Sequence, residues 1–251
     1  MRIGVYLGRY READLNEPYA EGPAEFAQGL VPHLVFAMSK AGNDEEVVFY
    51  GDEKTLRPDL LEQLEMGEVL TEKAEGFENI VSAQRVFRVL PNGARCRVLF
   101  RVLPSSPSRL FGMFLDQVVL AFLIRYDRTT VLHSAANLGV FFPGRPQVIN
   151  LFDKVLRPGE QREGVLKRSL NSFLRLVFSF QKRFNSFFIC QSDALADHLS
   201  RFYGIDSGRV SVLNPGRSIF SSDKSDKFDR AVEEVFRVYT FLNVRINAKR
   251  S

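Results

Sequence analysis

Cysteine is scarce in this sequence. The two cysteines, Cys96 and Cys190, lie far apart along the 251 residues and have no metal-ligand spacing. This pattern excludes a disulfide framework and argues against a zinc site. Because Cys190 stands inside the apolar run FFIC, we expect it to be a small buried thiol.

Long hydrophobic runs are also missing. The longest apolar stretches, VVLAFLI and LVFSFQ, are far shorter than the roughly 20 residues that a membrane-spanning helix needs. The opening residues, MRIGVYLGRY, contain no hydrophobic region of signal-peptide length. We therefore expect a cytoplasmic protein, with peripheral attachment to the inner face of the membrane as a further option.

The common catalytic signatures are absent as well. The sequence has no P-loop, no G-x-G-x-x-G fingerprint and no metal-binding spacing, and no Ser-His-Asp arrangement can be assigned. We therefore expect neither a metal nor an organic cofactor.

The charge of the chain is unevenly distributed. Within a net charge of +4, residues 81–130 carry eight arginines against two aspartates, and residues 161–185 carry six basic residues against one glutamate. Basic surfaces attract the phosphates of nucleotides, anionic lipids or nucleic acid, although a solvated surface is the ordinary explanation for any one residue. No nucleic-acid-binding motif is recognisable, so nucleic acid is the least favoured of these partners.

Apolar runs alternate with amphipathic stretches along the chain. Strands are predicted in RIGVYLG, EVVFYG, TVLHSAANLG, PQVINLFDKV, SFFICQS and RVSVLNPG. Helices are predicted in GPAEFAQGLVPHLVFAMSKAG, RPDLLEQLEMGE, SRLFGMFLDQVVLAFLIRYDR, VLKRSLNSFLRLVFSFQKRF and the stretch after SFFICQS. This alternation predicts an α/β fold with a Rossmann-like, mainly parallel sheet and helices on both faces.

An arginine-rich hairpin interrupts the alternation. RVFRVL and RCRVLFRVL are separated by PNGA, and Asn92-Gly93 favours a tight turn that needs positive φ. We expect this hairpin, within residues 85–103, to be an addition at a sheet edge. Arg95, Arg97 and Arg101 are expected to share one face of its second strand.

The C-terminal part of the chain has a different composition. Residues 221–230, SSDKSDKFDR, are polar and are the predicted linker. The following VFRVYTFLNVRI is predicted to form one more strand. The expected division is a Rossmann-like domain over residues 1–217, then a linker and the truncated start of a second domain over residues 218–251.

Parallel sheets bind ligands beyond the carboxyl ends of their strands, and three stretches place polar groups there. At the first, Gly22 and Pro23 begin a predicted helix, whose free N–H groups and positive end can hold a phosphate or a sugar hydroxyl. A glycine that merely caps the helix fits the same pattern.

The other two stretches follow predicted strands later in the chain. VLHSAANLG places His133 near the end of a strand, beside Ser134 and Asn137. A neutral imidazole pointing into the cleft would hydrogen-bond a substrate oxygen or stabilise charge, whereas a histidine hydrogen-bonded in the core is equally consistent. Asp153 follows the next strand and would accept from a sugar hydroxyl or cap a loop, which is the commoner use.

The order of these segments resembles the N-terminal, acceptor-side half of a GT-B glycosyltransferase of the family-4, or group 1, type. MRIGVYL and EGPAEFAQGLVPHLVFAMSKAGNDEEVVFYG resemble the family's first strand, its Gly-Gly-x-Glu helix start and its second strand. VLHSAANLG is similar to the strand that supplies an active-site histidine, and PQVINLFDKV to the strand that ends in His-Asp. FFICQSDALADHLSRFYGIDSGRVSVLNPG is similar to the segment that closes the domain, so the resemblance covers residues 1–217.

The resemblance implies an activity and roles for individual residues. The activity is transfer of a sugar from a nucleotide-sugar to a glycan, lipid-linked or small-molecule acceptor, usually with retention at the anomeric carbon. Gly22, Pro23 and Glu25 would lie near the donor phosphates or the acceptor. His133 would help bind the donor sugar and stabilise the reacting centre, and Asp153 would be a cleft residue.

The family's Asn-Pro-Gly connection leads into a second domain that holds most of the donor, so Asn214 and Gly216 are expected hinge residues. The sequence departs from the family pattern at Pro23, which replaces a glycine, and at Phe152, which replaces a histidine. The donor-binding domain is absent from these 251 residues. A non-catalytic GT-B-derived binding module, or an inactive truncated fragment that self-associates through its interdomain face, is therefore the alternative.

A basic, phenylalanine-rich helix suggests a further partner. LKRSLNSFLRLVFSFQKRF places five basic residues among large apolar side chains. This composition predicts reversible docking on an anionic bilayer, although a helix with its apolar side in the core has the same composition.

Overall fold

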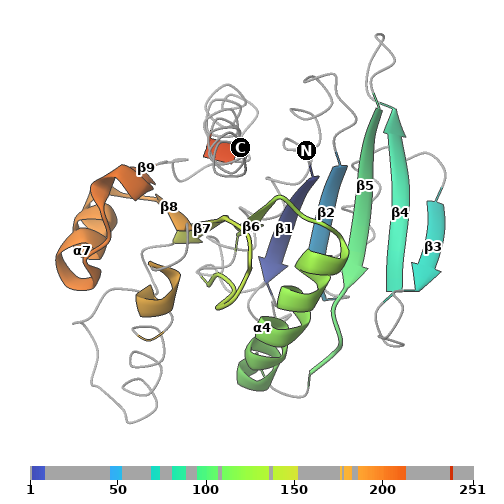
Figure 1. Ribbon diagram of the computed structural model, residues 1–251, viewed down its shortest axis with the longest axis horizontal. Coiled ribbons are helices and arrows are strands. Elements are labelled where there is room, and N and C mark those ends of the chain that lie inside the picture. Colours follow the sequence, from blue (N-terminus) through green and yellow to red (C-terminus); the bar gives the residue numbers. More distant parts are fainter. Residues whose placement is uncertain are drawn as a thin grey trace, which may run out of the picture.

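A nine-stranded sheet forms the centre of the molecule (Figure 1), with the strand order β3-β4-β5-β2-β1-β6-β7-β8-β9. The computed structural model describes residues 2–8, 46–52, 69–73, 81–88, 95–106, 109–135, 138–151, 176, 178–182, 186–212 and 238–239. The strands are β1 Arg2–Gly8, β2 Glu46–Gly51, β3 Val69–Lys73, β4 Val81–Arg88, β5 Arg95–Val102, β6 Val131–Ser134, β7 Gln147–Leu151, β8 Ser186–Cys190 and β9 Val210–Val212. The helices are α4 Arg109–Tyr126, α7 Asp193–Tyr203 and the 3-10 turn η1 Ser207–Arg209.

Seven of the strands, from β5 to β9 along the sheet, run parallel to one another. β4 is antiparallel to β5, and β3 is antiparallel to β4. The parallel strands read as continuous apolar runs because both of their faces are covered, and β7 is buried at every position. The prediction of a Rossmann-like α/β fold is therefore confirmed.

The order of the strands reverses between β1 and β6. From β1 the sheet extends to β2 and β5 on one side, and through β6, β7, β8 and β9 on the other. In open α/β sheets, such a switch point opens the crevice in which ligands bind, at the carboxyl ends of the strands. The fold therefore singles out the ends of β1 and β6.

Both described α-helices cover the same face of the sheet. The buried side of α4 packs on the central strands, and α7 packs on β7 and β8. The first cluster includes Tyr6, Tyr50, Leu120, Leu123, Ile124 and Leu132, and the second includes Ile149, Phe178, Phe188, Cys190, Leu195 and Leu199. Val238 and Tyr239 are helical and reach the opposite face, where Tyr239 contacts His133.

The ends of α7 follow from its sequence. The Ser192 hydroxyl accepts a hydrogen bond from the backbone N–H of Leu195 at 3.2 Å, which caps the first turn. Gly204 has φ 61° and ends the helix in the left-handed conformation that glycine favours. Ser192 and Gly204 thus fix the bounds of the helix that packs on β8.

The predicted hairpin is present as the antiparallel pair β4 and β5. β4 extends the sheet at this edge, while β5 also pairs with β2 and so belongs to the parallel part. β3, which the sequence did not predict, lies outside β4. Arg97 is exposed, but Arg101 is buried and forms an ion pair with Asp127, because a buried charge needs a partner of opposite sign.

The strand predicted in VFRVYTFLNVRI is wrong at Val238 and Tyr239, which are helical and buried. Short apolar runs do not distinguish a strand from a buried helix.

The predicted linker over residues 221–230 lies outside the described residues. Of the basic helix predicted before β8, the described part is helical at residues 178–181, with Phe178 and Gln181 buried.

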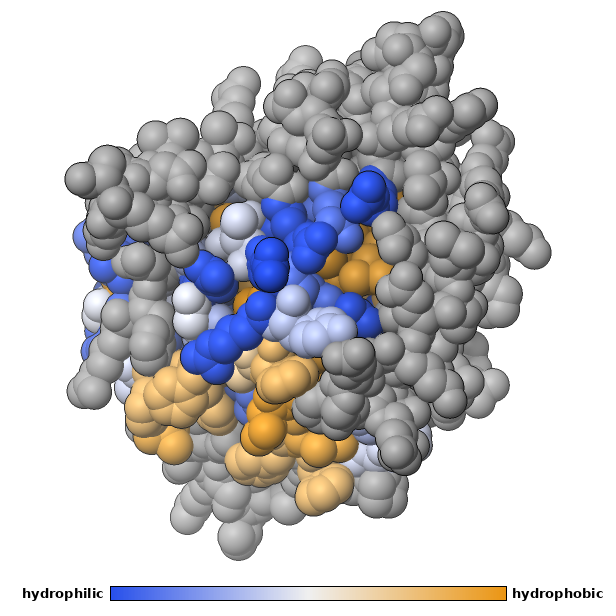
Figure 2. Space-filling view, turned by 45° about the vertical axis from the view of Figure 1, so that its right-hand side comes forward, coloured by the Kyte–Doolittle hydropathy of each residue, from blue (hydrophilic) through white to orange (hydrophobic). Residues whose placement is uncertain are grey.

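The outer side of α4 is unusually apolar for an exposed surface. In Figure 2 the hydrophobic surface gathers in the lower half of the view, bordered above by hydrophilic residues. Phe111, Phe114, Val118, Phe122 and Tyr126 are exposed large side chains of α4, and each is between 43% and 70% exposed. In the described part of the chain, no helix combines the length and apolarity needed to cross a membrane.

Candidate functional site

The site lies where the carboxyl ends of β1, β6 and β7 come together. The backbone N–H of Ala135, just after β6, donates to the carbonyl of Tyr6 in β1 at 2.9 Å. At the end of β1, Gly8 has φ 88° and the pairing with β2 shifts register after Tyr6. Residues other than glycine rarely adopt such a φ, so Gly8 suits this change of direction at the switch point.

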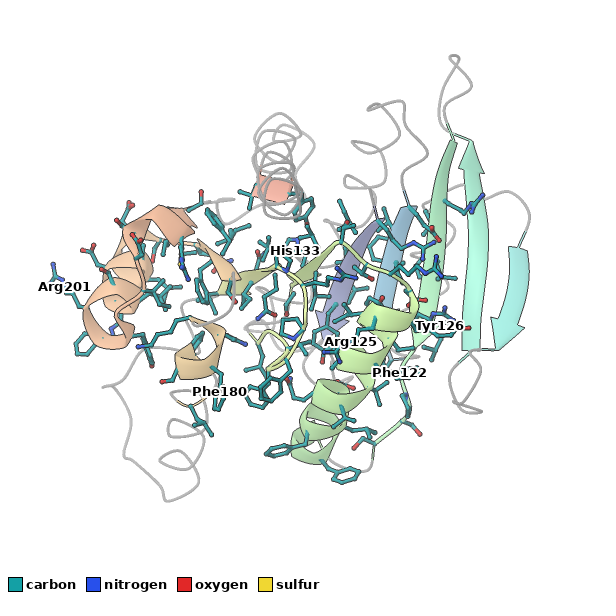
Figure 3. All side chains as sticks on the ribbon, in the orientation of Figure 1. Phe122, Arg125, Tyr126, His133, Phe180 and Arg201 are labelled. Carbon is teal, nitrogen blue, oxygen red and sulfur yellow. The ribbon has the colours of Figure 1, made fainter. Side chains whose placement is uncertain are left out.

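His133 is the central polar residue of this site (Figure 3). It lies in β6 opposite Val5 of β1 and Val148 of β7, and its side chain has no exposed surface. Its Nε2 atom is 3.0 Å from Oδ1 of Asn150, and its Nδ1 atom is hydrogen-bonded to the hydroxyl of Tyr239. The imidazole is therefore held from both sides.

These two partners fix the tautomer of His133. An amide oxygen only accepts hydrogen bonds, so Nε2 carries the proton and donates it to Asn150. Nδ1 is then the acceptor, and the Tyr239 hydroxyl donates to it. The result is a directed chain of hydrogen bonds from Tyr239 through His133 to Asn150.

Burial keeps this chain of hydrogen bonds uncharged. It lowers the pKa of His133 to about 4, and the hydrogen bond with Asn150 offsets only part of that effect. Burial also raises the pKa of Tyr239 well above its ordinary value, so the phenol keeps its proton. At neutral pH His133 is therefore an uncharged imidazole that accepts a hydrogen bond at Nδ1, and it is not present as the imidazolium that would act as a general acid.

Ser134 faces the other side of the sheet from His133. Successive residues of a strand alternate between faces, and the Ser134 hydroxyl donates to the carbonyl of Leu138 at 2.6 Å. Ser134, predicted as an acceptor-binding residue, therefore does not share a face of the sheet with His133. Its contact instead holds the chain that leaves β6.

His133 itself is placed differently from the open cleft position that the sequence suggested. It ends a strand as predicted, but Tyr239 covers it, so the core position that the sequence also allowed describes this structure. The remaining predicted site residues lie outside the described residues: Gly22, Pro23, Glu25, Asn137, Asp153, Asn214 and Gly216.

Sequence reasoning missed Asn150 and Tyr239. A signal for Asn150 was present, because it is a polar residue inside the buried strand QVINL, and it shares a face with Val148, which pairs with His133. Tyr239 gave no such signal, since it is separated from His133 by 106 residues and belongs to a segment predicted as a strand.

The described residues contain no group of three or more histidine, cysteine, aspartate or glutamate side chains that could hold a metal ion. The polar groups that the structure does describe at the site include the neutral hydrogen-bonding groups of Tyr239, His133 and Asn150.

The fold and the site define a Rossmann-like α/β domain with a buried chain of hydrogen bonds, from Tyr239 through His133 to Asn150, at its switch point. No family model matches the sequence, and no curated protein matches it. Among solved structures, the chain is similar to a crystal structure of a glycosyltransferase from Rickettsia africae ESF-5, with 10% sequence identity and a TM-score of 0.39. The match covers 92% of this chain and 49% of that one, so this chain spans about half the length of that protein.

Proposed function

We propose that this chain is the acceptor-side domain of a glycosyltransferase. The reaction is transfer of a sugar from a nucleotide-sugar to a glycan, lipid-linked or small-molecule acceptor, with retention at the anomeric carbon. The observation that carries the proposal is the position of His133, a neutral imidazole near the carboxyl end of β6 at the switch point of the sheet. The sequence resemblance over residues 1–217 supports the same reaction.

The proposed role of His133 is to accept a hydrogen bond from a substrate hydroxyl at Nδ1. The Tyr239 hydroxyl makes this contact in the structure, so a sugar hydroxyl would take its place when Tyr239 moves aside. Asn150 would hold the ring in the tautomer that leaves Nδ1 free to accept. A group placed to pair with a hydroxyl favours substrates that carry one, because its buried polar atom would otherwise stay unpaired.

The other residues of the proposed cleft follow from the sequence resemblance. Gly22, Pro23 and Glu25 would contact the donor phosphates or the acceptor, with Asn137 and Asp153 nearby. Asn214 and Gly216 would form the hinge to a donor-binding domain. That domain would supply the groups that neutralise the donor phosphates as charge develops in the transition state.

A non-catalytic binding module is the second candidate. It is favoured by the complete burial of His133 under Tyr239, which is the arrangement of a structural histidine. The replacement of a family glycine by Pro23 and of a family histidine by Phe152 points the same way.

The test compares His133→Gln with His198→Gln in this chain together with the proposed donor-binding domain. His198 is a second histidine, on α7 and away from the switch point. Product formation would be measured with labelled nucleotide-sugars and candidate acceptors, and circular dichroism would check the fold of each variant. We expect His133→Gln to lower turnover about 100-fold and His198→Gln to leave it unchanged.

The outcomes separate the candidates. Unchanged turnover in a folded His133→Gln protein would assign the imidazole to the core alone. Binding of a nucleotide-sugar or an acceptor by the wild-type protein, without transfer, would favour the binding module. Neither binding nor transfer across the panel would refute both.

A further inference from the structure

α4 exposes a continuous apolar stripe, which we call the α4 stripe. It consists of Phe111, Phe114, Val118, Phe122 and Tyr126, which are 57%, 53%, 70%, 43% and 44% exposed. These residues follow one another at spacings of three or four, so they lie along one side of the helix. Three of the five are phenylalanines, whose side chains cannot form hydrogen bonds with water.

The opposite side of the same helix is apolar as well. Leu120, Leu123 and Ile124 are fully buried against the sheet. A helix that is apolar all round is normally buried all round, and contiguous exposed apolar patches mark interaction sites. The α4 stripe therefore has the composition of an interaction surface.

The chain after β6 widens this apolar surface. Gln117 of α4 accepts from the backbone N–H of Phe141 at 2.8 Å, which holds this chain against the helix. Its neighbour Phe142 is 56% exposed, and the rings of Phe142 and Phe180 are 5.8 Å apart. Figure 3 shows Phe122 and Tyr126 on α4 and Phe180 on the neighbouring helical segment.

The exposed charged residues that the structure describes at the C-terminal end of α4 are basic. Arg125 lies on the same side of α4, with its guanidinium against Gly144, and Arg128 follows the helix. Both arginines are exposed, and Arg145 is partly exposed.

The acidic residues of this region are buried. Asp116 and Asp127, the only acids in the described ranges 109–135 and 138–151, are bonded to Tyr6 and Arg101 respectively. In this part of the described chain, the exposed surface therefore combines apolar side chains with positive charge.

We propose that the α4 stripe docks on the surface of an anionic lipid bilayer. The stripe extends over about 22 Å of helix, so α4 would lie in the plane of the interface with its phenylalanines among the acyl chains. Tyr126 suits the boundary between acyl chains and headgroups, and Arg125 and Arg128 would pair with lipid phosphates. A second copy of this chain is disfavoured as the partner because pairing two such surfaces brings positive charge against positive charge.

The proposal does not depend on sugar transfer, since it concerns binding alone. The test is co-sedimentation of the full chain with vesicles of phosphatidylcholine, with and without phosphatidylglycerol. The variants are Phe114→Ser with Phe122→Ser, and Arg125→Gln with Arg128→Gln. Phe202→Ser and Arg201→Gln are matched controls, because both residues are exposed on α7, outside the stripe.

We expect the wild-type chain to sediment with the anionic vesicles and to be released by salt. Removing the two phenylalanines is expected to weaken this binding at least about tenfold, because each buries a large apolar side chain. The arginine pair is expected to weaken it only on anionic vesicles, and both controls are expected to bind within about twofold of wild type.

Three results would overturn the proposal. The first is equal recovery of the wild-type chain in the supernatant with and without phosphatidylglycerol. The second is vesicle binding that the stripe variants leave unchanged. The third is a wild-type dimer in sedimentation velocity that the phenylalanine variants convert to a monomer, without binding to either vesicle, which would make a second copy or another protein surface the partner.

Discussion

The Nε2 atom of His133 in β6 lies 3.0 Å from the Oδ1 atom of Asn150 in β7. His133 pairs in register with Val148, so Asn150 is two residues further along the neighbouring strand, on the same face of the sheet. The hydrogen bond thus crosses between two strands close to their carboxyl ends. It orients the one histidine that the sequence placed at the candidate site.

The burial of His133 makes the stability of the fold depend on pH. The pKa of His133 is lowered from 6.5 to about 4 in the folded protein, so between these values the unfolded chain binds more protons. The contribution of His133 to stability is therefore fully present above pH 6.5 and is lost as the pH falls toward 4. We expect the protonation of His133 to lower the free energy of unfolding by about 2 kcal/mol between pH 7 and pH 5, as measured by urea unfolding.

The control for this prediction is a pair of histidine variants. His133→Gln should abolish this part of the pH dependence, whereas His198→Gln should leave most of it, because His198 is only partly buried on α7. A wild-type protein that loses no more stability than His133→Gln between pH 7 and pH 5 would contradict the buried neutral imidazole.

Two substitutions of Asn150 should act on His133 in different ways. Asn150→Leu leaves the proton on Nε2 buried without an acceptor, which is expected to cost about 1–3 kcal/mol of stability. Asn150→Asp keeps an acceptor and adds a negative charge, so the pKa of His133 should rise. Titration of the imidazole by NMR measures the shift, and a pKa that stays about 4 in Asn150→Asp would show that the amide does not contact the ring.

Tyr239 can be tested as the cover of His133. Tyr239→Phe removes the hydroxyl that donates to Nδ1 and should cost about 1–3 kcal/mol. Tyr239→Ala should cost about 3–5 kcal/mol and expose the imidazole, because the ring is completely buried. Modification by diethyl pyrocarbonate, in a background lacking the other histidines, reads out the exposure.

The expected contrast is fast modification of His133 in Tyr239→Ala and slow modification in wild type. Tyr126→Phe is the matched control, because Tyr126 is 44% exposed and lies on α4, away from His133. Equal modification rates in wild type and Tyr239→Ala would show that Tyr239 does not cover the site.

Much of the sheet was predictable because its strands are local features of the sequence. The apolar runs at Arg2–Gly8 and Glu46–Gly51 match β1 and β2 residue for residue, since a strand covered on both faces needs no polar alternation. β3 was missed because VLTEK has only two apolar residues, which are adjacent and followed by three polar ones, so it lacks both the apolar run and the alternation that predict a strand. Val238 and Tyr239 were misassigned because an apolar run of this length fits either a strand or a helix.

The candidate site was only partly predictable, because its contacts are distant in sequence. The position of His133 near the end of a strand followed from the local pattern, but its burial depends on Tyr239. Ser134 is next to His133 in the sequence but lies on the other face of the sheet, because neighbouring residues of a strand point in opposite directions. The ion pair of Arg101 did not follow from the local pattern either, because its acidic partner, Asp127, is 26 residues away.

The buried ion pair between Arg101 and Asp127 should dominate the stability of this side of the sheet. The Nε atom of Arg101 lies 3.2 Å from both carboxylate oxygens of Asp127, and the side chains are only 7% and 2% exposed. The hydroxyl of Tyr50 donates to the same carboxylate at 3.0 Å, and burial, followed by the charge of Asp127, raises the pKa of Tyr50. Asp127 therefore has partners on β5 and β2, which it ties to the end of α4.

Removing one member of this pair leaves the other charge buried without its partner. Arg101→Met is expected to lower the free energy of unfolding by about 3–5 kcal/mol, and Asp127→Asn by a similar amount. The double variant should lose less than the sum of the two, because it leaves no unpaired charge, and the difference measures the coupling between them. Arg2→Met with Glu46→Gln is the matched control, since that ion pair is partly exposed at 30% and 14% and should couple by at most about 1 kcal/mol. Urea unfolding of the four proteins in each cycle gives both coupling energies, and additive losses for Arg101 and Asp127 would show that the two charges do not depend on each other.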